Sequence, residues 1–123
     1  MSIKLLQLKS GEDVIADVDE MTVGEDAEKR VIGYYLNRAC VVKLRREIER
    51  TPDQDAKETK RGYEVSLFPW MPLSAEDTIP VVADWVVTIV EPVERLIQMY
   101  MEDVVNGSRN QSDSADEQRE TDQ

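Results

Sequence analysis

Apolar and polar residues alternate along much of the chain, which is the pattern of half-buried β-strands. Ile3 to Leu8 is rich in isoleucine and leucine, and a turn from Lys9 to Glu12 follows it. In residues 13 to 19, valine and alanine alternate with aspartate. These two segments predict a β-hairpin whose acidic side chains face water.

A polar stretch from Thr22 to Arg30 predicts a loop, and a long strand-forming block then runs from Val31 to about Glu49. In the later half of this block, apolar residues point one way while Lys43 and Arg45 point the other. A block of this length favours a bend or a bulge near Asn37-Arg38.

The middle of the chain mixes loops with shorter strands. Thr51 to Gly62 contains no large apolar side chain and predicts a loop, whereas Tyr63 to Leu67 alternates again. Phe68 to Leu73 contains two prolines and so cannot be a central strand. Ile79 to Val82 and Trp85 to Val90 are apolar on both faces and require cover on both sides.

Glu91-Pro92 marks the start of a predicted helix, since proline fits the first helical turn. Asn106-Gly107 is expected to end it. The segment from Ser108 to Gln123 is polar and cannot bury enough surface to order itself. We therefore expect one domain over residues 1–105 and a disordered acidic tail over 106–123. The predicted apolar face of the helix comprises Val93, Leu96, Ile97, Tyr100 and Val104.

Net charge and composition limit the ligands and the catalytic sites that the chain is expected to have. The net charge is −11, with 15 basic and 26 acidic residues, which disfavours non-specific attraction to nucleic acid or to an anionic membrane. The chain has no histidine and one cysteine, Cys40, in an apolar run, so histidine-based triads and a structural zinc site are not expected. We expect a cytoplasmic protein that is not an enzyme, has no membrane segment and carries no cofactor.

Acidic pairs such as Glu12-Asp13 and Glu76-Asp77 could hold Mg²⁺ or Ca²⁺, or form an acid–base pair. Their spacing matches no known cage such as the EF-hand loop. A solvated strand face or an acidic loop explains them more simply.

One segment is locally basic. Between Arg38 and Arg61 there are eight bases and five acids. Lys43 and Arg45 share a strand face and could contact a phosphate backbone together, and nearby tyrosines could stack on bases. An ordinary solvated face is the alternative interpretation. The candidate nucleic-acid contacts are Lys43, Arg45, Arg46, Lys60 and Arg61, and the tyrosines are Tyr34, Tyr35 and Tyr63.

The segment around Trp70 and Met71 also has two interpretations. It could form a recognition surface, or it could plug the end of a small barrel and seal a subunit contact. The helix is most simply docked on the sheet, because its polar side is acidic and does not suit a membrane surface. The candidate subunit-interface residues are Trp70, Met71, Val86, Thr88 and Val90.

Four segments in order resemble a known family. Leu5 to Val18 is similar to the first Sm motif of Sm-like (Lsm/Hfq-type) proteins, in which an apolar strand, a glycine turn and a second apolar strand open a barrel. Tyr34 to Val42, Pro69 to Pro72 and Val87 to Pro92 resemble further segments of the small Sm-like proteins of tailed phages and cyanophages.

This resemblance implies a mainly β fold, a small, strongly bent five-stranded Sm-like barrel with one C-terminal α-helix. It also implies a homo-oligomeric ring of about five to seven subunits and RNA binding around its pore. If the chain is phage-encoded, its compartment is the host cytoplasm.

Two features depart from the family pattern. Asp19-Glu20-Met21-Thr22 matches the first RNA-contacting loop poorly, and Ala83-Asp84 stands in place of the second, so no RNA-binding residue is carried over. The helix follows the barrel here, whereas typical Sm domains place theirs first. A ring-shaped protein-interaction scaffold without nucleic acid is therefore the second functional hypothesis.

Overall fold

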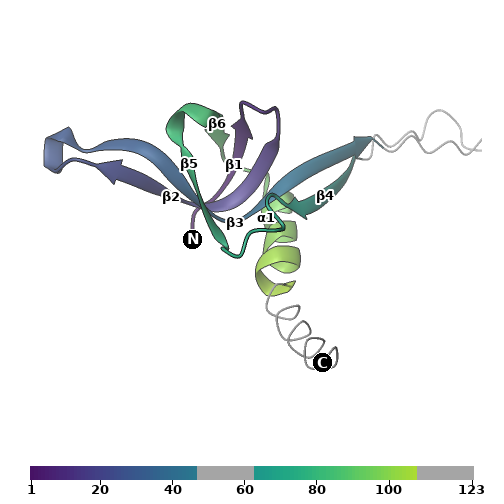
Figure 1. The fold of residues 1–123 in the computed structure, drawn as a ribbon. Helices are drawn as coiled ribbons and strands as arrows, with labels where there is room; N and C mark the ends of the chain where they lie inside the picture. The colour runs from purple at the N-terminus through teal and green to yellow at the C-terminus, as the bar shows by residue number, and fades with distance from the viewer. Residues whose placement is uncertain (47–62, 108–123) are drawn as a thin grey trace, which may run out of the picture.

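The computed structural model describes residues 1–46 and 63–107, which form a bent antiparallel sheet with one C-terminal helix (Figure 1). The predicted mainly β fold is confirmed. The strands are β1 (Ile3–Leu8), β2 (Asp13–Val23), β3 (Arg30–Arg46), β4 (Tyr63–Pro69), β5 (Thr78–Val82) and β6 (Val86–Val90). Short 3-10 turns lie at Asp26–Glu28 and Ala83–Trp85, and helix α1 (Glu94–Tyr100) continues as a π-helical turn over Met101–Asn106.

The described sheet has six strands, so the expectation of five was wrong. Its main path is β4-β3-β2-β1-β6, and β5 pairs with β3 off this path. Both β4 and β5 lie along the edge of β3 that faces away from β2, β4 against residues 40–46 and β5 against residues 33–37. They are thus two consecutive pieces along one edge, and they are counted separately because residues 70–77 leave the sheet between them.

The bulge predicted near Asn37-Arg38 is confirmed. Ile15 pairs with Cys40 and Asp17 pairs with Asn37, so one residue of β2 faces two residues of β3. Arg38 has a φ of 53°, which is the left-handed region that non-glycine residues adopt rarely. An extra residue in one strand bends it and increases its twist. The 17-residue β3 therefore changes direction at the bulge, and it pairs with β5 before this point and with β4 after it.

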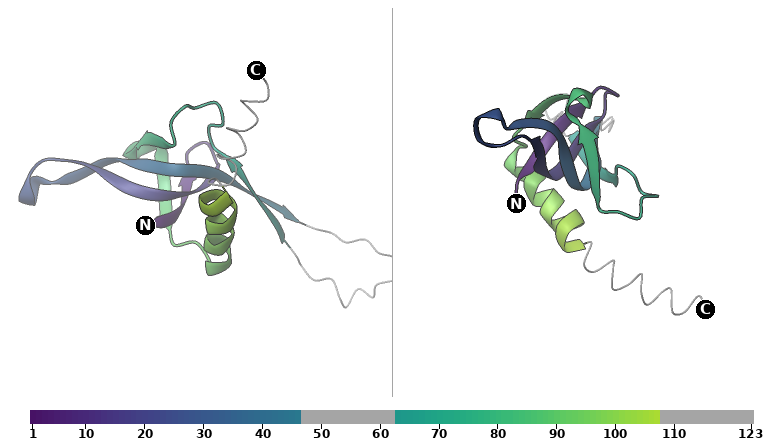
Figure 2. Two further views of the ribbon diagram at one scale, coloured as in Figure 1. Left: turned by 90° about the horizontal axis from the view of Figure 1, so that it is seen from below. Right: turned by 60° about the vertical axis from the view of Figure 1, so that its left-hand side comes forward.

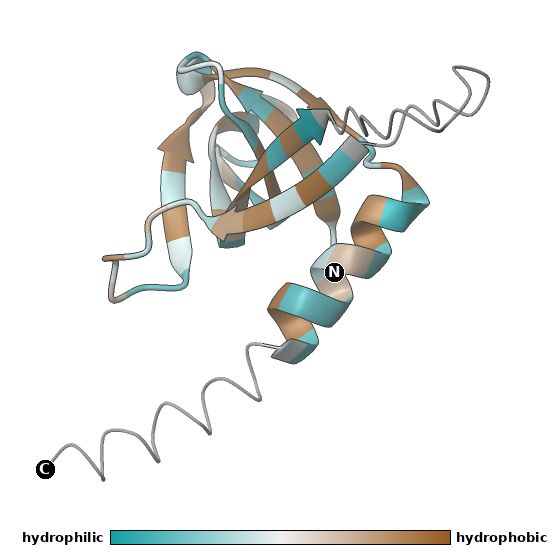
Figure 3. Ribbon diagram, turned by 90° about the vertical axis from the view of Figure 1, so that its right-hand side faces the viewer, coloured by the Kyte–Doolittle hydropathy of each residue, from teal (hydrophilic) through white to brown (hydrophobic). Residues whose placement is uncertain are grey.

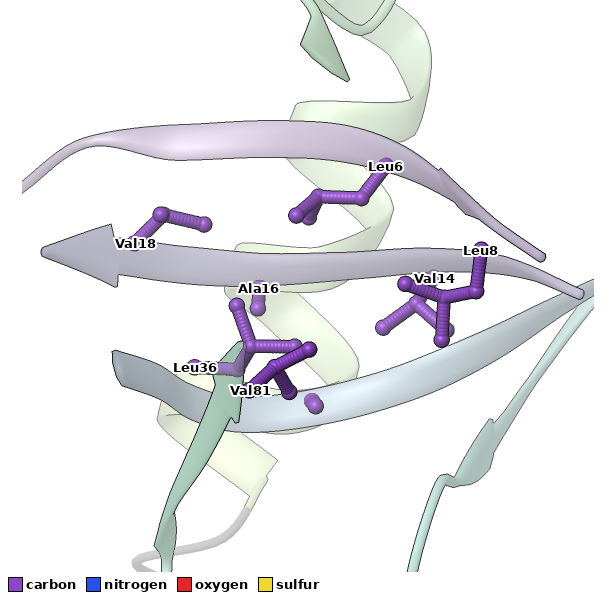
Figure 4. Close-up of a cluster of buried hydrophobic side chains, with 8 residues drawn as sticks. Leu6, Leu8, Val14, Ala16, Val18, Leu36 and Val81 are labelled. Atoms are coloured by element: carbon purple, nitrogen blue, oxygen red, sulfur yellow. The ribbon is translucent and has the colours of Figure 1, made fainter. Parts of the chain in front are cut away.

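Two apolar clusters lie on opposite faces of the sheet. The inner cluster joins β1, β2, β3 and β5, and Figure 4 shows its side chains converging between those strands. The outer cluster lies under the helix, whose apolar side faces the sheet in Figure 3. The inner residues are Leu6, Leu8, Val14, Ala16, Val18, Leu36, Ala39 and Val81, and the outer residues are Ile15, Cys40, Tyr100 and Val105.

The helix differs from its prediction at its start. It begins at Glu94 rather than at Pro92, and the preceding Val93 is in extended conformation and 71% exposed. The π-helical turn has a longer period than an α-turn, which brings Val105 to the buried face below Tyr100. The helical segment ends at Asn106 with Gly107 as its C-cap, as predicted, although Gly107 has φ and ψ of −65° and −33° rather than a left-handed conformation.

Two hairpins project from the body of the molecule at opposite ends of β3 (Figures 1 and 2). The predicted loop from Thr22 to Arg30 is shorter than expected, because β2 and β3 remain paired as far as Val23 and Arg30. The loop predicted at Thr51–Gly62 and the tail predicted from Ser108 lie outside the described residues. No helix in the described ranges is long and apolar enough to cross a membrane.

Candidate nucleic-acid interface and subunit edges

The β3–β4 hairpin places two cations and an aromatic ring on one face. Lys43 pairs with Ser66, and Val41, two residues earlier on β3, pairs with Phe68, two residues later on β4. The side chains of Lys43 and Phe68 therefore lie on the same side of the hairpin. The Lys43 Nζ lies 5.1 Å from the centre of the Phe68 ring, within the range of a cation–π contact. We call Lys43, Arg45 and Phe68 the basic face.

The basic face is accessible and only partly neutralised. Lys43 and Arg45 are exposed, as predicted for the solvent side of β3, and Phe68 is 49% exposed. Glu64 pairs directly with Arg45 across the hairpin. The structure forms no ion pair between these two described side chains, and an exposed pair would be worth only about 0.2–1 kcal/mol, so the arginine is available to another partner.

The other predicted contacts are distributed differently. Arg46 ends β3 next to this face, and Lys60 and Arg61 lie outside the described residues. Tyr34 packs against the inner cluster and pairs with Val81, on the far side of the bulge from Lys43. The structure therefore brings Phe68, rather than Tyr34 or Tyr35, to the cations.

Sequence reasoning missed Phe68 because its position depends on the register between β3 and β4. Residues 47–62 separate the two strands, so no short turn fixes the pairing in the sequence. The alternation from Glu64 to Phe68 was the available signal, but it could not identify the residue opposite Val41.

The bulge that orients the hairpin is held from two sides. The Tyr100 hydroxyl lies 3.0 Å from the Asn37 carbonyl oxygen and 3.1 Å from that of Arg38, and it donates to this pair. The Arg38 N–H donates to the Asp77 carbonyl oxygen at 2.8 Å. Backbone groups that a bulge removes from the strand pairing are thus satisfied by the helix and by the 70–77 segment.

Burial changes the acidity of two groups beneath the bulge. Desolvation raises the pKa of Tyr100 to about 12, and the neighbouring Cys40 contributes to the shift. Desolvation likewise raises the pKa of the Cys40 thiol to about 11. Both groups are neutral at physiological pH, so Cys40 is a buried apolar residue, as its sequence context predicted, and a poor nucleophile.

Trp70 is partly buried and packs against the inner cluster. Its backbone N–H donates to the Ala39 carbonyl oxygen at 2.9 Å, and its indole Nε1 donates to Glu12 Oε1 at 3.3 Å. Met71, the next residue, is half exposed. Of the predicted interface residues, Trp70 and Val86 contact the core, while Met71, Thr88 and Val90 face outward.

The sheet has free edges. In the described residues, β4 pairs only with β3, β6 only with β1 and β5 only with β3. Pro80 in the middle of β5 has no N–H to donate, so that edge is a poor template for another strand. Strand β6 has no proline and no charge, and it exposes Val87 and Val90.

A cavity of about 410 Å³ lies between the 70–77 segment, the bulge and the end of the helix. Leu67, Ile79 and Val104 supply apolar lining, whereas Arg38, Asp77 and Asp103 supply charges. Across residues 1–46 and 63–107, no three histidine, cysteine or acidic side chains gather closely enough to hold a metal ion.

Comparisons with known proteins do not identify the chain. No protein-family model matches it, and no curated protein matches it significantly. The resemblance to Sm-like proteins stays a prediction from the sequence segments given above.

Proposed function

We propose that this protein is the subunit of a homo-oligomeric Sm-like ring that binds RNA or single-stranded DNA on the basic face of its β3–β4 hairpin. The observation that carries the proposal is the sharing of one exposed hairpin face by Lys43, Arg45 and Phe68. Cations contact phosphates, and an exposed aromatic ring stacks on a base regardless of its identity. No catalytic role is proposed.

Ring formation is supported by the two unblocked edges. Strand β4 of one copy would pair with β6 of the next, and this would cover exposed apolar residues on both strands. The contact joins two different surfaces, so repeated copies form a closed ring when the rotation between them closes. As in the expectation from the sequence, about five to seven copies would close it.

The binding site is tested by removing its charges. Lys43→Gln with Arg45→Gln should weaken binding of a fluorescent single-stranded RNA by about tenfold, because both phosphate contacts are lost. The salt dependence of binding should fall as well, since each phosphate contact contributes to it. Fluorescence polarisation at low and moderate salt measures both effects. Phe68→Ala should weaken binding with little change in the salt dependence, since it removes stacking and no charge.

Lys9→Gln with Arg95→Gln is the matched control, because both side chains are exposed and lie away from the hairpin. It makes the same change in net charge. Equal losses in the two double variants would reject the basic face as the site.

A second function, that of a protein-interaction scaffold, is favoured by the net charge of −11. In that case neither RNA nor single-stranded DNA binds to the intact oligomer at low salt. The same titrations with the unmodified protein therefore separate the two functions.

A further inference from the structure

The hairpin at the start of β3 ends as a two-stranded ribbon that no third strand accompanies. Strand β2 leaves β1 after Asp17, and β3 meets β5 only from Gly33 onward. Residues 22–32 therefore have only each other as strand partners, whereas Asp19 to Met21 pair with a part of β3 that also pairs with β5 (Figure 1). Two-stranded hairpins are marginally stable in water unless one of their faces packs against something. We call residues 19–32 the acidic hairpin.

The acidic hairpin presents both apolar and charged side chains to solvent. Val23, Val31 and Ile32 are exposed on it. Residues 19–32 also contain five acids and two bases, a net charge of −3. The acids are Asp19, Glu20, Glu25, Asp26 and Glu28.

The other end of β3 has the opposite charge. Beyond Val41, which is the last partner of β2 in this direction, the described strand pairs with β4 alone. This ribbon contains Lys43, Arg45 and Arg46 against the single acid Glu64. It also exposes Leu44 and Phe68, so both ribbons combine unburied apolar residues with charge.

The two ribbons cannot meet within one molecule. They are the two ends of one strand, and they point away from each other in two views (Figures 1 and 2). Their opposite charges and exposed apolar residues can therefore complement each other only between two copies of the chain.

From this arrangement we infer that the acidic hairpin of one copy docks on the basic face of another copy. The hairpin then competes with nucleic acid for Lys43 and Arg45, so the assembly limits its own binding. The docking stands on the charges and exposure of the two ribbons, whereas the competition rests on the proposed function.

Cross-linking tests the docking directly. Protein labelled with ¹⁵N is mixed with unlabelled protein and treated with a carbodiimide, which joins a carboxylate to an amine without a spacer. Mass spectrometry should find Lys43 joined to Glu25, Asp26 or Glu28 in peptides of mixed isotope composition. Absence of these mixed peptides, while other cross-links form, would overturn the docking.

Competition is tested with a triple variant, Glu25→Gln, Asp26→Asn and Glu28→Gln. Asparagine suits position 26, where φ is 53°. The variant should lose the mixed cross-links and bind single-stranded RNA about threefold or more tightly, since each lost pair contributes a fraction of a kcal/mol. The matched control, Asp84→Asn, Glu94→Gln and Glu102→Gln, changes the net charge equally at exposed positions elsewhere.

The outcomes separate the two proposals. If both triple variants gain the same affinity, net charge explains the effect and the competition is wrong. If no variant binds RNA or single-stranded DNA, the proposed function fails, and the cross-links alone decide the docking.

A charge exchange tests the docking independently of any ligand. One protein carries Lys43→Glu, and the other carries Glu25→Lys with Asp26→Lys. When the two are mixed, the carbodiimide should join the carboxylate introduced at position 43 to an amine introduced at position 25 or 26. Failure of these cross-links to form in the mixture would count against the docking.

Discussion

The Tyr100 hydroxyl joins the helix to the sheet at the point where β3 bends. The side chain is fully buried, and its hydrogen bonds reach the carbonyl oxygens of Asn37 and Arg38. A bulge frees these carbonyl groups from the regular strand pairing. A buried acceptor without a donor is destabilising, so this single hydroxyl supports the bent strand.

Tyr100→Phe should lower the free energy of unfolding by about 1–3 kcal/mol, because the ring stays in place while the Asn37 and Arg38 carbonyl oxygens lose the hydroxyl donor and only Arg38 keeps the weaker Cys40 thiol. Urea unfolding followed by circular dichroism measures the change. Tyr35→Phe is the control, since that ring is 39% exposed and its hydroxyl can bond water. Similar losses in both variants would contradict the role of the Tyr100 hydroxyl.

The stability of the fold should also fall in alkaline solution, because two buried groups retain their protons in the folded chain. Folding raises the pKa of Cys40 from 9.0 to about 11 and that of Tyr100 from 10.0 to about 12. Between these values the unfolded chain loses protons that the folded chain retains, so stability decreases with rising pH. The contribution is complete below pH 9 and is lost progressively between about pH 9 and 12.

Urea midpoints at pH 8 and pH 11 measure this dependence. Cys40→Ala with Tyr100→Phe should show a smaller decrease than the unmodified protein, because both groups that retain protons are gone. An unchanged decrease would mean that other groups cause it.

At the scale of elements, the π-helical turn brings Val105 into contact with the sheet. Val105 is 8% exposed and belongs to the outer cluster, whereas Val93 before the helix is 71% exposed. Val105→Ala should therefore cost about 1–3 kcal/mol of unfolding free energy. Val93→Ala, the matched control, should stay within about 0.5 kcal/mol. If both variants lowered the free energy of unfolding equally in thermal or urea unfolding, the burial of Val105 against the sheet would be contradicted.

The elements were predictable where one physical rule dominated. Alternation gave the strands, and the length of the Val31–Glu49 block gave the bulge, because so long a strand must bend around a small core. A 3.6-residue period correctly placed Leu96, Tyr100 and Val104 against the outer cluster. It could not predict Val105, which only the wider turn buries. Phe68 joined the basic face through a register that no short turn encodes.

At the scale of the whole molecule, the two unblocked strand edges differ in sequence and lie at opposite ends of the sheet path. In the proposed ring, two such edges would join head to tail rather than face to face. Strand β5 is a built-in contrast, because its edge carries Pro80. A charged side chain introduced on β6 should therefore disrupt assembly, whereas one introduced on β5 should not.

Val87→Lys should convert the oligomer to a monomer, because a lysine on an edge strand opposes the addition of another strand. Light scattering at micromolar concentration measures the mass. Val82→Lys is the control: the two valines are 58% and 66% exposed, and only Val87 lies on the proposed contact. A monomeric unmodified protein, or equal dissociation by both variants, would reject assembly through β6.

The link between Tyr100 and the bulge also has a consequence for synthesis. A ribosome makes the six strands that the structure describes before it makes Tyr100, so the outer face of the sheet, with Ile15 and Cys40, has no helix over it in the nascent chain. Domains fold as units, and partly made ones expose apolar surface that favours aggregation. In this protein the outer face of the sheet is covered only after the helix has left the ribosome. A chain that stalls between β6 and Tyr100 would therefore be the form most prone to aggregate.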